Sequence, residues 1–184
     1  MKAVTTTTPT LANASRVYVG TYGKYNNGSI AGAWLDLADY ADAEEFHNAC
    51  RKLHKGERDP EFMFQDWENI PSGFIHESGL NDPEGLWEWL EMDDDERQLV
   101  TLYRDEVDSS ADLEKAQDMF YGSYESEEDF AMEYTHTTSG EADFDSIESR
   151  LGIVIDWKAT WFCNLRHYFS SVYHKGEYWI FINR

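Results

Sequence analysis

This 184-residue sequence has few cysteines and no long apolar run, and each absence argues against a class of protein. Its two cysteines, Cys50 and Cys163, lie far apart without a CxxC spacing, so the sequence predicts reduced thiols and not a disulfide framework. No uninterrupted apolar segment approaches the length that spans a membrane, and the Thr-rich run Thr5–Thr10 lacks the apolar centre of a signal peptide. We therefore expect a soluble, cytoplasmic protein that does not bind a membrane.

Basic residues are scarce too, above all in one part of the chain. The segment Asp82–Glu148 holds 23 acidic residues and only three basic ones, so its formal charge is −20, while that of the whole chain is −21. A surface this negative repels the phosphates of DNA, RNA and anionic lipids. The sequence thus argues against direct nucleic-acid binding and predicts a basic partner.

The acidic segment does not have the pattern of a disordered tail, because its acids alternate with large apolar residues at helical spacing. Its runs also begin with capping pairs, as at Asp93 with Glu96 and at Ser126 with Asp129. We expect several short helices, each of which buries one stripe and holds carboxylates at fixed positions on the other.

These carboxylates are the candidate partner-binding groups. On a rigid surface they offer arginine and lysine side chains the contacts that phosphates offer. We expect the contacts to come from Glu84, Glu88, Glu91, Asp94, Asp95, Asp105, Glu106, Asp108, Asp112, Glu114, Asp118, Glu125, Glu127, Glu128, Asp129, Glu133, Glu141, Asp143 and Asp145.

The N-terminal part of the chain predicts a disordered leader, residues 1–15, and a small α+β module, residues 16–71. Alternating residues indicate strands at Arg16–Tyr22, Ile30–Leu37 and Phe62–Trp67, with a turn at Asn26-Asn27-Gly28 and a helix over Asp42–Leu53.

Beyond residue 71 the sequence predicts two further modules, an acidic helical one over residues 72–122 and an α+β one over residues 123–184. The first opens with a linker, Ser72–Asn81, and Tyr121–Tyr124 interrupts its helical pattern. In the last module we expect a buried helix over Leu151–Leu165 and a hairpin of Tyr168–Tyr173 with Glu177–Ile182. The predicted fold class is α+β, in three small modules.

The run Val17-Tyr18-Val19-Gly20-Thr21-Tyr22-Gly23-Lys24-Tyr25-Asn26-Asn27-Gly28, followed by Gly32-Ala33-Trp34, closely resembles the opening of the ArdA antirestriction proteins of plasmids and conjugative transposons. The resemblance continues through the acidic middle into Ile155-Asp156-Trp157-Lys158-Ala159. It implies an elongated homodimer of three-module protomers that mimics B-form DNA. It also implies a partner, the specificity and modification subunits of a type I restriction-modification enzyme, and no catalytic residue, metal or cofactor.

Three local patterns have ordinary structural explanations. Gly20-x-x-Gly23-Lys24 lacks the spacing and the hydroxyl residue of a phosphate loop, so we interpret it as a turn. His47, Cys50 and His54 share a helical face, but no fourth metal ligand is adjacent. The side chains of Asp93-Asp94-Asp95 point in different directions on a helix, which suits an N-terminal cap better than an ion site.

Charge placement without the resemblance leaves DNA mimicry and general acidic solubilisation both open. The alternative function is an acidic adaptor or chaperone that sequesters basic DNA-binding proteins. A weaker third hypothesis is a metal-dependent hydrolase that uses the carboxylates.

Overall fold

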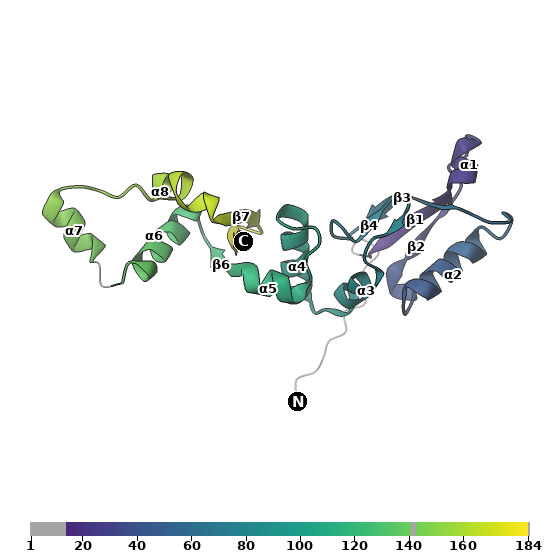
Figure 1. Ribbon diagram of the computed structural model, residues 1–184, viewed down its shortest axis with the longest axis horizontal. Coiled ribbons are helices and arrows are strands. Elements are labelled where there is room, and N and C mark those ends of the chain that lie inside the picture. Colours follow the sequence, from purple (N-terminus) through teal and green to yellow (C-terminus); the bar gives the residue numbers. More distant parts are fainter. Residues whose placement is uncertain (1–13, 141–142, 184) are drawn as a thin grey trace, which may run out of the picture. The chain divides into compact units, whose positions relative to one another are not determined.

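The computed structural model describes residues 14–140 and 143–183 (Figure 1). Contacts divide the chain into two compact units, Met1–Leu113 and Glu114–Arg184. Helices, strands and three small sheets occur together, so the predicted α+β class is confirmed. The three-module division with boundaries at 71 and 122 stays a prediction.

The first unit is built on a three-stranded antiparallel sheet of order β2-β1-β3. Its strands are β1 (Arg16–Thr21), β2 (Ala33–Asp36) and β3 (Phe62–Glu68), followed by the two-residue strands β4 (Ile75–His76) and β5 (Gly79–Leu80). Its helices are α1 (Tyr22–Asn26), α2 (Ala43–Leu53), α3 (Pro83–Glu91) and α4 (Asp94–Glu106), with a 3-10 turn at Leu37–Asp39.

Helix α2 covers one face of this sheet, as Figure 1 shows. Val17 and Val19 alternate on β1 and are fully buried, and Phe64 pairs with Val19 across the sheet. Phe46 of α2 contacts Phe64, with 5.8 Å between ring centroids. The core of the unit therefore lies between α2 and the face that carries these residues, as expected from an amphipathic helix that starts at the Asp42 cap.

The connection between β1 and β2 contains the predicted turn, with Gly28 at a φ of 78°, but the short helix before it was not predicted. Thr21 accepts a hydrogen bond from the Lys24 backbone N–H and caps the five-residue helix α1, and the second strand starts only at Ala33. The preceding Gly32 permits a close approach, because a Cβ there would lie 2.3 Å from the Val19 carbonyl oxygen.

The predicted linker Ser72–Asn81 is also wrong. This segment contains the β4–β5 hairpin, Phe74 is buried in it, and the Phe64 backbone N–H donates to the Glu77 carbonyl. Upstream, Ala14 and Ser15 are buried, and the Ser15 hydroxyl donates to the Asn69 carbonyl. The rest of the predicted leader, residues 1–13, lies outside the described residues.

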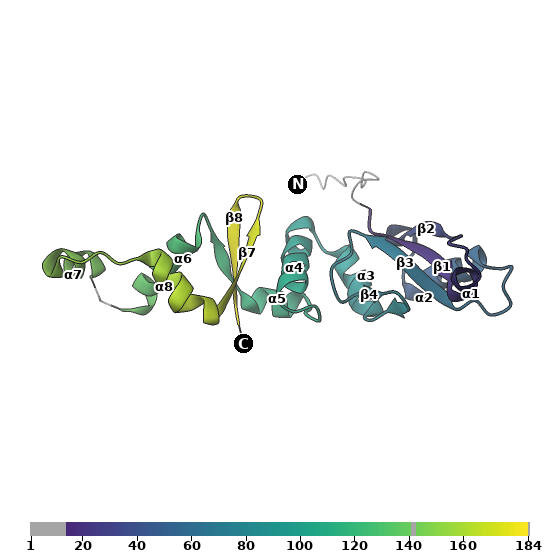
Figure 2. The same cartoon turned by 90° about the horizontal axis from the view of Figure 1, so that it is seen from above.

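The second unit packs helices against a sheet of order β6-β8-β7. Its core joins Phe130, Ala131, Trp161, Phe169 and Ile180. The predicted terminal hairpin is confirmed as β7 with β8, drawn in yellow in Figure 2. The elements are α5 (Leu113–Met119), β6 (Phe120–Tyr124), α6 (Glu127–Thr138), α7 (Phe144–Leu151), α8 (Trp157–Cys163), a 3-10 turn (Leu165–His167), β7 (Phe169–His174) and β8 (Glu177–Ile182).

The buried helix predicted over Leu151–Leu165 is wrong. Gly152, at φ 64°, ends α7, and Asp156 caps a separate α8 of seven residues in which Trp161 is the buried side chain. The Tyr121–Tyr124 region, which we read only as an interruption, belongs to the edge strand β6. No helix in the described part of the chain is long and apolar enough to cross a membrane.

Candidate partner-binding surface

Helix caps hold the acidic residues in place. Asp93 and Glu96 form a capping box at the start of α4, and Asp82 and Ser126 cap α3 and α6 through backbone N–H groups three residues on. Acidic residues fill the first turns that follow, where the positive end of the helix dipole stabilises a carboxylate by about 0.3–1 kcal/mol. The local sequence therefore favours both the helices and the display of charge.

The structure places the predicted carboxylates on the surface of the protein. Those that it describes are exposed, except that Asp108, Glu127 and Glu128 are half-buried. Glu141 lies outside the described residues. The unit Met1–Leu113 has 23 acidic and nine basic residues, a formal charge of −14, and Glu114–Arg184 has 13 and six, a charge of −7. Each unit thus carries part of the acidic surface.

Several predicted carboxylates also have structural partners. Asp105 accepts from the Ser72 backbone N–H at 2.6 Å, Asp129 from the Ser126 hydroxyl at 2.6 Å, and Asp143 from the Ser146 N–H at the start of α7. Glu133 accepts from the Tyr124 hydroxyl at 3.2 Å, and burial together with the Glu133 charge raises the pKa of Tyr124 to about 12. These carboxylates stabilise the fold as well as contributing negative charge.

Two of the three basic residues of the acidic segment bind backbone carbonyls. Arg97 donates to the Leu90 and Met92 carbonyls, and Arg104 donates to those of Ser72 and Ala111. Arg104 is buried, its guanidinium lies 3.5 Å from the ring centroid of Phe74, and burial lowers its pKa. Both guanidinium groups therefore bind the backbone of the fold, and the nearby acidic residues Asp82, Asp108, Asp105 and Asp112 partly oppose the effect of burial on the pKa of Arg104.

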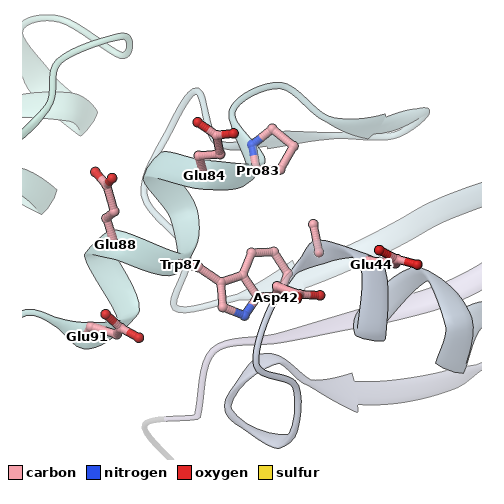
Figure 3. Close-up of a pocket in the computed structure, with 8 residues that line it drawn as sticks. Asp42, Glu44, Pro83, Glu84, Trp87, Glu88 and Glu91 are labelled. Atoms are coloured by element: carbon pink, nitrogen blue, oxygen red, sulfur yellow. The ribbon is translucent and has the colours of Figure 1, made fainter.

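The first unit also contains a groove of about 410 Å³ between α3 and the start of α2 (Figure 3). The sequence hypothesis missed Asp42 and Glu44, which the fold brings beside Glu84, Glu88 and Glu91. Residues 84, 87, 88 and 91 have the spacing of one helical face, so the α3 side of the groove could have been predicted from the sequence. The α2 side comes from about forty residues upstream, and no pattern in the sequence links it to α3. The lining residues are Asp42, Ala43, Glu44, Pro83, Glu84, Trp87, Glu88 and Glu91.

The helical face of His47, Cys50 and His54 does not assemble a metal site. Burial raises the pKa of the Cys50 thiol to about 12, and the His54 ring nitrogens lie next to Lys24 Nζ and the Val19 carbonyl. Among residues 14–140 and 143–183, no group of three or more His, Cys, Asp and Glu side chains is arranged to hold a metal ion.

Comparison with known proteins identifies a family for most of the chain. The family model described as "Antirestriction protein (ArdA)" matches residues 17–172, which include the sheet of the first unit, the acidic helices and most of the second unit. No curated protein and no solved structure matches the chain.

Proposed function

This chain belongs to the ArdA family of antirestriction proteins, and from that premise we propose that it mimics DNA and occupies the DNA-binding site of type I restriction-modification enzymes. The family consists of inhibitors and is not a family of enzymes. In this proposal the protein contacts the specificity and modification subunits and thereby blocks restriction of incoming DNA and, to some degree, its modification.

The exposed carboxylates on capped helices are the observation that carries the proposal. Duplex DNA has one charge per about 1.7 Å of axis, so some twenty carboxylates at that density correspond to about 34 Å, near one helical turn. Most of the predicted carboxylates are exposed to solvent. In this proposal a basic DNA-binding groove pairs with them as it pairs with phosphates.

The proposed function also includes a homodimer of this chain. Leu151, Ile153 and Val154 are consecutive or nearly so in sequence, and their side chains are exposed by 60%, 48% and 89%. Single exposed apolar side chains are ordinary, but several that are exposed next to one another are typical of interaction surfaces. We propose that they contribute to the contact between the two protomers of a homodimer.

Displacement of DNA tests this function directly. A labelled duplex with the target site is bound to a type I enzyme, and the purified protein is added at increasing concentration. A DNA mimic displaces the duplex, and it binds a cationic protein that does not enclose DNA, such as lysozyme, much more weakly. Equal affinity for both proteins would instead support the acidic adaptor, and absence of displacement would refute the proposal.

A further inference from the structure

The groove between α2 and α3 combines an apolar floor with an acidic rim. Trp87 lies in the middle of it, on the side of α3 that faces the start of α2 (Figure 3). The indole is largely buried, and its Nε1–H donates to the Tyr40 carbonyl at 2.9 Å, so the ring is held in one orientation. Pro83 and Ala43 complete the apolar part. The volume of about 410 Å³ lies in the range of small-ligand sites.

The rim has negative charge without a cation to balance it. Asp42, Glu44, Glu84, Glu88 and Glu91 are exposed, and none of the residues that line the groove is basic. Asp42 caps α2 by accepting from the Glu45 N–H. The other four side chains make no hydrogen bond or ion pair within the described residues. The groove is therefore complementary to a positively charged occupant.

Helix stability does not explain this arrangement of acids. Glu84 lies in the first turn of α3, where the helix dipole favours a carboxylate. Glu91 is the last residue of α3, where the dipole opposes one, and Glu84, Glu88 and Glu91 repel each other at spacings of three and four residues. A cation from another molecule would relieve this repulsion.

The apolar floor restricts the kind of cation. A small inorganic ion gains nothing from Trp87, whereas a long basic side chain packs its methylene groups on apolar surface and extends its charged head to the rim. Arginine fits better than lysine, because its guanidinium is more weakly hydrated and binds carboxylates through two parallel hydrogen bonds.

We propose that this groove receives an arginine side chain of the partner protein. The inference rests on the proposed function and adds to it one contact of defined shape. Exposed carboxylates elsewhere on the protein each make a separate contact with a basic surface, whereas the groove combines an acidic rim with the exposed part of an indole.

The first experiment compares two triple variants of the full chain in the DNA-displacement assay. Glu84→Gln, Glu88→Gln and Glu91→Gln together remove three rim charges, and Asp94→Asn, Asp95→Asn and Glu106→Gln together remove three exposed charges of α4 outside the groove. We expect the groove triple to weaken the competition constant at least tenfold more than the control triple. Equal effects would overturn the groove proposal and leave the proposed function intact.

A second pair of variants tests the floor without changing the charge. Ala43→Leu places a larger side chain in the groove, and Ala38→Leu makes the same change at an exposed position outside it. We expect only Ala43→Leu to weaken displacement, by about tenfold. Circular dichroism of each variant shows whether it is folded, and a folded Ala43→Leu protein with parental activity would count against the proposal.

A direct titration tests the groove independently of the proposed DNA mimicry. N-acetyl-arginine amide is added to the ¹⁵N-labelled protein, and the Trp87 indole N–H signal, assigned with Trp87→Phe, is followed by NMR. We expect this signal to shift in the parent and not in the groove triple, and N-acetyl-citrulline amide, which lacks the charge, to have no effect. If the parent displaces no DNA, the proposed function fails, and the titration alone decides for or against the groove.

Discussion

His54 shows how one side chain of the first unit is held in a single protonation state. Its ring is buried, with Nδ1 2.7 Å from Lys24 Nζ and Nε2 3.2 Å from the Val19 carbonyl oxygen. Because an ammonium group only donates, Nδ1 accepts and Nε2–H donates to the carbonyl, which requires the neutral ring. Burial, more than the neighbouring Lys24 charge, lowers the pKa of His54.

This geometry predicts a loss of stability in mild acid. With the folded-state pKa below its ordinary value of about 6.5, the His54 contribution is complete above pH 6.5 and is lost as the pH falls through that value toward the folded-state pKa. We expect the free energy of unfolding in urea to fall more between pH 7.5 and 5.5 in the parent than in His54→Gln. At pH 7.5 the variant should be about 1–3 kcal/mol less stable, because it disrupts buried hydrogen bonds. The same pH dependence in both proteins would contradict the assignment.

At the scale of elements, α4 depends on its capping box. The Asp93 carboxylate accepts from the backbone N–H groups of Asp95 and Glu96, whereas Asp94 is the first residue of the helix and is not its cap. We expect Asp93→Ala to lower the free energy of unfolding by about 1 kcal/mol, because a cap is lost. Asp94→Ala removes the same charge, but the higher helix propensity of alanine offsets the lost dipole interaction, so the net change should be at most a few tenths of a kcal/mol. Urea unfolding of both variants checks this, and equal losses would show that charge and not capping matters.

At the scale of the whole molecule, inhibition by distributed charge predicts gradual damage. An exposed charge pair contributes about 0.2–1 kcal/mol, so Asp118→Asn or Glu125→Gln alone should leave the DNA-competition constant within several-fold of the parent. Combinations of about four, eight and twelve substitutions should weaken it progressively and reduce its salt dependence in step. EDTA should not affect displacement, because no contact in the proposal uses a metal.

An enzyme would behave differently under the same substitutions. Removal of one catalytic acid or base lowers a rate by about 10² to 10⁴, so a single change would abolish activity. One exposed carboxylate outside the groove whose loss alone removed inhibition, in a variant that circular dichroism shows to be folded, would therefore contradict mimicry by distributed charge.

The proposed homodimer leads to a prediction for the exposed apolar segment of the second unit. We expect Val154→Asp to shift the mass measured by light scattering from dimer to monomer, because burial of a charge in the interface is unfavourable. Thr137→Asp adds the same charge at an exposed position of α6 and should leave the dimer intact. A parent that scatters as a compact monomer, with a radius of gyration of about 16 Å, would refute the dimer.

Features that depend on near neighbours in the chain could be predicted from the residues alone. The helix starts at Asp42, Asp93 and Ser126 were predictable, because a cap bonds to backbone groups only two or three residues away. The β7–β8 hairpin was predictable for the same reason, since its strands alternate around a short turn. The exposure of most candidate carboxylates also followed from the sequence, because charged groups stay in water unless they are paired.

Features that depend on partners distant in sequence could be recognised only in the folded protein. The segment predicted as a linker packs into the fold through Phe74, because Arg104, thirty residues away in sequence, covers the Phe74 ring. Val154 is an apolar residue but is exposed, since it lies in the irregular segment between the end of α7 at Gly152 and the start of α8. The groove exists because the fold brings Asp42 and Glu44 next to the Glu84–Glu91 face of α3. Local patterns carry no information about such pairs, since the contacts form only when distant segments pack together and bury their apolar surface.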